Sequence, residues 1–166
     1  MCHRIAEALA ERAAADLLVA KKLSPCSDID DAVIGFYVQQ AVEKSLKAVL
    51  TLRDVDFPMM VHDLKFLLTL AADSGLEVPA ELTGTCWLTA WGTTYENGEA
   101  SPGTLDRRHA LAIGSTAVDW CFAEVGLAPD DHDDGSFNAV RPPPPPSPTP
   151  GLGRTETRGG SSDQRK

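Results

Sequence analysis

Basic residues are scarce in this sequence, which has 15 Lys and Arg against 24 Asp and Glu and a formal net charge of -9. Proteins that bind nucleic acid in general neutralise phosphates with an excess of Lys and Arg. The charge balance therefore argues against a general nucleic-acid-binding surface, and only a local basic patch remains open as an alternative.

Paired cysteines and long apolar runs are also missing. The four cysteines are Cys2, Cys26, Cys86 and Cys121, without a CxxC pair or zinc-ligand spacing. They indicate free thiols in a reducing compartment, and no metal site is expected. No stretch approaches the roughly 20 apolar residues of a membrane span, and Arg4 and Glu7 fall where a signal peptide is apolar. We expect a cytoplasmic protein without a membrane partner.

Aromatic residues make up only 6% of the chain, whereas hydrophobic residues reach 43% with many Ala and Leu. This composition favours an all-α protein. Apolar residues recur at helical spacing in five segments, at about 5–23, 28–53, 63–73, 79–94 and 105–125. They predict one helical domain over residues 1–126.

The spacing also predicts which residues of these helices are buried. The first helix is expected to bury Ile5, Leu9, Ala13, Leu17 and Ala20. The fourth is expected to begin at Pro79 and to bury Leu82, Cys86 or Trp87, and Ala90.

The composition changes after residue 126, where a charge run is followed by RPPPPPSPTP and a Gly/Ser-rich end. Such sequences lack the apolar residues needed for a core, so residues 127–166 are predicted to be disordered. Asp130, His132 and Asp134 imitate the start of a calcium loop, but Arg141 stands where that loop needs a bidentate Glu.

The second helical segment, FYVQQAVEKSLKAVL at 36–50, carries a polar row on one face. Gln40, Lys44 and Lys47 are spaced by four and three residues, and Glu43 lies on the flank. A solvated helix face with favourable charge spacing is one explanation of this row, and a binding face is the other.

Three stretches carry a family resemblance: ADLLVAKKL at 15–23, FYVQQAVEKSLKAVL at 36–50 and FPMMVHDLKFLLTL at 57–70. In this order and spacing they resemble the HEPN domain family (higher eukaryotes and prokaryotes nucleotide-binding). The pairing of QQAVEKSLKA with a downstream HDL carries most of the likeness. The resemblance implies an up-and-down bundle of about five helices that dimerises.

The resemblance also implies what the polar row does. Gln40, Glu43, Lys44 and Lys47 would face a cleft or dimer seam that takes a phosphate-bearing, nucleotide-type ligand or a protein partner. Lysines can hold phosphates as point charges, and Gln40 can hydrogen-bond a base or sugar. The partner that the family suggests is a small nucleotidyltransferase encoded as a separate chain, as in toxin–antitoxin-like pairs; no other cofactor is expected.

Two family features are altered in this chain. Ribonucleases of the family use an Arg and a His separated by four to six intervening residues, and no His here has an Arg at that distance upstream. An Arg-Tyr-Pro phrase is replaced by TTYENG, in which only Tyr95 matches. We include Tyr95 among the candidate binding residues, although the lost Arg removes a positive charge.

The remaining histidines offer only weak catalytic candidates. His62 and Asp63 form a polar pair beside the lysine row, although Asp63 also suits a helix start and His62 a packed or capping role. His109 follows Arg107 and Arg108 directly.

Three hypotheses result. The first is a non-catalytic or degenerate HEPN module that binds a nucleotide-type ligand or a protein. The second is a metal-independent ribonuclease or RNA-binding protein with an unconventional site. The third is a plain helical interaction scaffold.

Overall fold

A computed structural model describes residues 2–99 and 101–128 of the chain. The chain divides into two units, residues 1–130 and 131–166. The expected disordered segment lies outside the described residues from position 129 onward, as does the calcium-loop imitation. Leu127 follows the last helix without secondary structure of its own.

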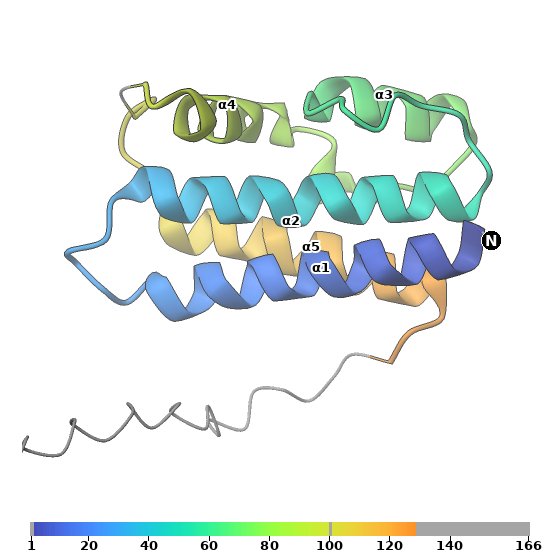
Figure 1. Cartoon of the computed structure of the whole chain (residues 1–166), viewed down its shortest axis with the longest axis horizontal. Helices are drawn as coiled ribbons and strands as arrows, with labels where there is room; N and C mark the ends of the chain where they lie inside the picture. The colour runs from blue at the N-terminus through green and yellow to red at the C-terminus, as the bar shows by residue number, and fades with distance from the viewer. Residues whose placement is uncertain (1, 100, 129–166) are drawn as a thin grey trace, which may run out of the picture. The chain divides into compact units, whose positions relative to one another are not determined.

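The described residues form α-helices and short 3₁₀ turns without a strand, which confirms the all-α prediction. The elements are α1 (Cys2–Leu23), α2 (Asp31–Leu52), α3 (Leu64–Asp73), η1 (Ala80–Leu82), η2 (Thr85–Leu88), α4 (Thr89–Asn97) and α5 (Arg107–Val125). Helix α2 lies in the middle with α1 beside it, α5 lies behind both, and α3 and α4 follow one another along its other side (Figure 1).

Aspartate caps set the starts of three helices. Asp30, Asp63 and Asp106 each accept a hydrogen bond from a backbone N–H in the first turn of α2, α3 and α5. A side-chain acceptor satisfies a donor that has no partner inside the helix. Gly98 and Gly126 end α4 and α5 with φ of 66° and 78°, a left-handed conformation that favours glycine.

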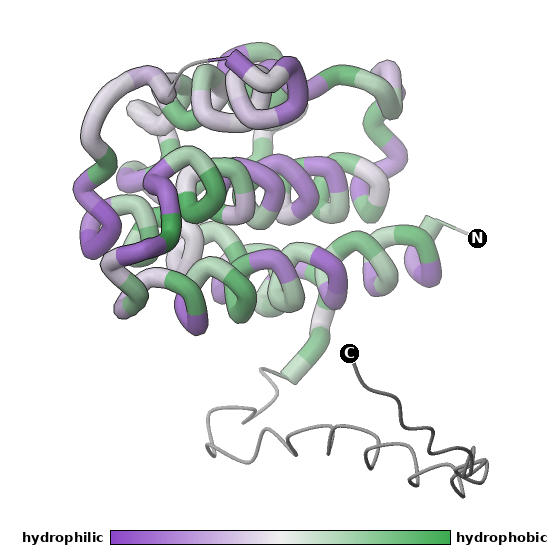
Figure 2. Tube along the Cα trace, turned by 60° about the vertical axis from the view of Figure 1, so that its left-hand side comes forward, coloured by the Kyte–Doolittle hydropathy of each residue, from purple (hydrophilic) through white to green (hydrophobic). Residues whose placement is uncertain are grey.

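Helix α1 packs on α2 through small side chains. Its buried residues are Ala6, Ala10, Ala13, Leu17 and Ala20. The prediction was wrong for Ile5, which is 45% exposed, because alanines one position further along make the close helix contact. Figure 2 shows hydrophilic and hydrophobic residues alternating around the helices, as expected for amphipathic packing.

The segment after Pro79 does not form the single helix that its pattern predicted. Two 3₁₀ turns precede α4, which begins only at Thr89. The buried residues here are Leu82, Thr85, Leu88 and Trp91. Their spacing of three matches the three residues per turn of a 3₁₀ helix, and it leaves Cys86, Trp87 and Ala90 on the exposed side.

Candidate functional site

A buried carboxylate, that of Glu43, is the centre of the polar row on α2. Glu43 is 2% exposed and Lys47, one turn later, is 4% exposed. The Lys47 Nζ donates to Glu43 Oε1 at 2.7 Å and to the carbonyl oxygen of Met59 at 2.8 Å. His62 Nδ1 lies 3.1 and 3.2 Å from the two Glu43 oxygens. The ion pair therefore ties α2 to the connection that leads into α3.

A chain of amides continues from Glu43 toward the edge of α2. Gln39 Nε2 donates to Glu43 Oε2 at 2.7 Å, and Gln40 Nε2 donates to Gln39 Oε1 at 2.8 Å. Lys44 Nζ then donates to Gln40 Oε1 at 2.9 Å and pairs with Asp16 of α1. The row is thus part of one continuous hydrogen-bonded network that joins α1, α2 and the connection leading into α3.

Charges at the two ends of this chain fix the orientation of both glutamine amides. The ionised Glu43 carboxylate can only accept, so Gln39 turns its NH₂ toward it and its oxygen toward Gln40. The Lys44 ammonium can only donate, so the Gln40 oxygen faces Lys44. Within this row of side chains, each amide is hydrogen-bonded to its neighbours, which lowers the cost of burying polar groups in a low-dielectric interior.

This geometry contradicts the interpretation of the whole row as a solvated face. Glu43 and Lys47 lie in the interior, and only Gln40 and Lys44 keep partial exposure. The Lys47 ammonium is occupied by Glu43 and Met59, and Lys44 is matched by Asp16. Because each lysine of the row is paired with a carboxylate, the row carries no net charge and neither ammonium group is left unpaired to bind a phosphate.

Aromatic side chains flank the outer end of the network. Tyr95 of α4 is 43% exposed and stacks on Phe36 of α2, with ring centroids 4.5 Å apart. Helix α4 approaches α2 closely because Gly92 lies against Gln39, where an added Cβ would be 2.7 Å from the amide. We use the name "α2 face" for the surface formed by Phe36, Gln40, Lys44 and Tyr95.

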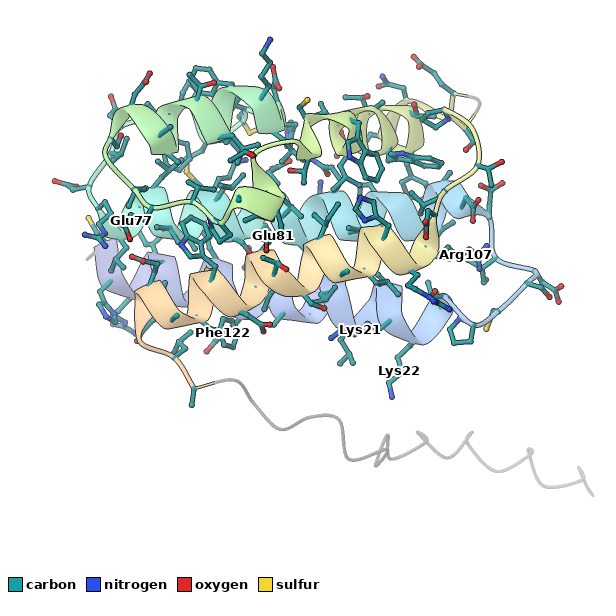
Figure 3. All side chains as sticks on the ribbon, turned by 180° about the vertical axis from the view of Figure 1, so that it is seen from behind. Lys21, Lys22, Glu77, Glu81, Arg107 and Phe122 are labelled. Carbon is teal, nitrogen blue, oxygen red and sulfur yellow. The ribbon has the colours of Figure 1, made fainter. Side chains whose placement is uncertain are left out.

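Arg107 has a structural role that removes it from the ribonuclease hypothesis. Its Nε donates to Asp31 at 2.7 Å, and its Nη atoms donate to carbonyls of the α1–α2 connection at 2.7 to 2.9 Å. Figure 3 shows Arg107 at the start of α5, beside that connection. The backbone N–H of Leu105, followed by Arg107, lowers the pKa of Asp31 although burial opposes this.

The catalytic candidates are not brought together. His109 is exposed, its ring lies parallel to that of Trp87 with centroids 6.2 Å apart, and Arg108 beside it is exposed too. His62 instead belongs to the Glu43 network. Within residues 2–99 and 101–128 no hydrogen bond or ion pair joins His62 to His109 or Arg108.

Asp63 and His62 have separate structural roles, a helix cap and a contact with the polar row. Asp63 caps α3 by accepting from the N–H groups of Lys65 and Phe66, as its position before the helix suggested. His62 lies beside the lysine row as the functional interpretation required, and the residue it contacts there is Glu43.

Several residues of the hydrogen-bonded network around Glu43 could not be predicted from the sequence spacing alone. Gln39 is 1% exposed and links the two halves of the network, Asp16 comes from another helix, and Met59 contributes a backbone oxygen. The only sequence signal is the Gln39–Glu43–Lys47 series with a constant spacing of four, which marks a second polar row beside the first.

Neither a group of metal-binding side chains nor a membrane-spanning helix is found among the described residues. No three side chains of the His, Cys, Asp or Glu type are grouped there to hold a metal ion. No helix in the same part of the chain is long and apolar enough to cross a membrane.

Comparisons with known proteins identify one family. No curated protein and no solved structure matches the chain. A family model does match, over residues 6–90, and its description is "HEPN domain". This range includes all of α2, the 53–63 connection and every residue of the hydrogen-bonded network around Glu43. The chain belongs to the HEPN domain family.

Proposed function

We propose that this protein is a non-catalytic HEPN module that binds a protein partner through the α2 face. The observation that carries the proposal is the contrast between the two halves of the polar network. Glu43 and Lys47 are buried and satisfied, whereas Gln40, Lys44 and Tyr95 keep partial or full exposure above them.

The composition of this face fits a protein partner better than a phosphate. Protein interfaces are enriched in aromatic residues and depleted of uncompensated charge at their centres. The α2 face offers the Phe36–Tyr95 stack and the Gln40 amide, with Lys44 neutralised by Asp16. A phosphate site would instead need cations that are not already matched by carboxylates.

The family suggests the kind of partner, a small nucleotidyltransferase encoded as a separate chain in a toxin–antitoxin-like pair. To test this, the tagged protein is recovered from its host, the co-purifying proteins are identified by mass spectrometry, and light scattering gives the stoichiometry, including whether two copies of this chain are present.

The decisive variant is Lys44→Glu/Tyr95→Ser, because Lys47 is buried and its replacement would disturb the fold. Arg108→Glu is the matched control, since it reverses one exposed charge on α5. We expect the double variant to lose the partner while its helicity is unchanged and the control retains it. Retention of the partner by the double variant would remove the α2 face from this role.

A nucleotide-type ligand is the second candidate, and the exposed Tyr95 ring on Phe36 favours it. Aromatic rings are sequence-tolerant platforms for bases, and each stacked base contributes about 1–3 kcal/mol. Equilibrium dialysis with adenosine and guanosine nucleotides tests it, and Tyr95→Ser should then weaken binding about tenfold or more. Equal binding by Tyr95→Ser would exclude this platform.

A further inference from the structure

Exposed positive charge without a carboxylate partner is concentrated on α1. The basic residues that form ion pairs with carboxylates are Lys44, Lys47, Arg53 and Arg107. Those with no such partner in the described part of the chain are all exposed, and they are Arg4, Arg12, Lys21, Lys22, Lys65 and Arg108. Most of them therefore lie on one helix, in a chain whose formal net charge is -9.

The side of α1 turned away from its buried residues has a regular spacing. Residues at alternating intervals of three and four positions lie in one line along a helix, and such a line is formed by Ile5, Ala8, Arg12, Ala15, Val19 and Lys22. We call this line the α1 seam. Its side chains are exposed apart from Val19, which is partly buried, and Figure 3 shows Lys22 extending away from the helices at its end.

Exposed apolar side chains accompany the charges of the α1 seam. Ile5 is 45% exposed, and Leu18, which flanks the seam, is 38% exposed. Apolar residues at a spacing of three and four, with charges among them, are the pattern by which one helix packs along another. At 1.5 Å per residue the seam is about 26 Å long, so it offers a second helix several turns of contact.

The distribution of charge on this face fits an acidic helix better than other polyanions. Arg12 and Lys22 are about 15 Å apart along the helix, whereas the phosphates of one DNA strand follow at about 3.4 Å. Glu11 is exposed beside Arg12 and would repel a phosphate backbone or an anionic lipid surface. Membrane-surface helices also use large apolar residues such as Trp, Phe and Leu, whereas the seam has alanine at positions 8 and 15.

We propose that the α1 seam is the docking surface for an acidic amphipathic helix of a partner protein. Apolar side chains of that helix cover Ile5 and Leu18. Its carboxylates pair with Arg12 and Lys22, which have no such partner in the described part of this chain. The α1 seam shares no residue with the α2 face, so this docking does not depend on the partner proposed for that face.

A benzophenone side chain at position 15, in the middle of the seam, tests the proposal in the full chain in its host. The crosslinked adduct is digested, and mass spectrometry identifies the segment that was contacted. We expect a segment of another protein in which Asp or Glu recurs at helical spacing beside apolar residues.

A synthetic peptide of that segment is then titrated with the full chain and followed by fluorescence anisotropy. Arg12→Glu should weaken binding about tenfold or more, because like charges then face each other, and added salt should weaken it as well. Replacing the opposing acidic residue of the peptide by Lys should restore binding to Arg12→Glu. The matched control is Arg108→Glu, which reverses an exposed charge on α5 and should leave binding unchanged.

Three results would overturn the proposal. The first is the absence of an adduct from position 15, or an adduct with nucleic acid, lipid or a second copy of this chain. The second is equal binding of the peptide by Arg12→Glu and Arg108→Glu, with circular dichroism showing that both variants keep their helicity. The third is loss of the adduct when Lys44→Glu/Tyr95→Ser is introduced, since this would assign the contact to the α2 face. An adduct that persists in that variant supports the α1 seam whether or not the α2 face has a partner.

Discussion

Replacing Lys47 by Met should destabilise the domain far more than the same change at Lys44. Both lysines lie on α2 and pair with carboxylates, but the Lys47 side chain is 5% exposed and that of Lys44 is 23% exposed. Removing Lys47 leaves Glu43 as a buried, uncompensated charge and frees the Met59 carbonyl oxygen. Removing Lys44 leaves Asp16 with access to water.

The magnitudes separate the two variants clearly. Loss of one partner of a buried pair costs about 3–5 kcal/mol, whereas a partly exposed pair contributes about 0.2–1 kcal/mol. Domains of this size unfold with a free energy of about 5–15 kcal/mol. With a urea m-value of about 2 kcal/mol/M, Lys47→Met should lower the midpoint by about 2 M and Lys44→Met by less than about 0.5 M.

The assay is urea unfolding at pH 7 followed by circular dichroism. A third variant, Glu43→Gln/Lys47→Met, removes both charges and should recover part of the loss, since a coupled pair is not additive. Equal midpoints for Lys47→Met and Lys44→Met would refute the conclusion that the row is divided into a buried and an exposed half.

Three further predictions concern the rest of the domain. Asp31→Asn should have a lower urea midpoint than the parent at pH 7 and about the same midpoint well below pH 4. The lowered carboxyl pKa of Asp31 contributes stability that is present above the unfolded pKa of about 3.9 and is lost as the pH falls through the folded pKa. A difference in midpoint that does not change with pH would contradict this. Gly92→Ala should cost about 1–3 kcal/mol by pushing on Gln39, whereas Gly84→Ala, with nothing within 4 Å of the new Cβ, should show no such loss of thermal stability. A thiol reagent should modify the exposed Cys2, Cys26 and Cys86 in the native protein but Cys121 only after unfolding, because burial raises the pKa of its thiol to about 12. Rapid modification of all four cysteines in the native protein would contradict this.

The helices were predictable where apolar periodicity, caps and terminators agree. Asp63 before Leu64 and Gly126 after Val125 mark boundaries that the structure keeps. The segment after Pro79 failed because its core contacts repeat every three residues, a period that resembles an α-helical pattern over short distances. Local sequence cannot tell which period the neighbouring helices will impose.

The polar row was predictable as a surface feature and not as a network. Spacing places Gln40, Lys44 and Lys47 on one face of a helix. Which of them are buried depends on the 53–63 connection, whose Met59 oxygen and His62 ring cover one side of α2. A tertiary contact of this kind, between residues 12 or more positions apart, leaves no periodic signal in the sequence.

Site-specific photo-crosslinking in the host tests the proposed contact between the α2 face and a protein partner. A benzophenone side chain is placed at position 40 on the α2 face and, in a control, at position 108 on α5. We expect an adduct with one defined protein from position 40 and none with that protein from position 108. Adducts from position 108 alone, or the same adducts from both positions, would contradict it.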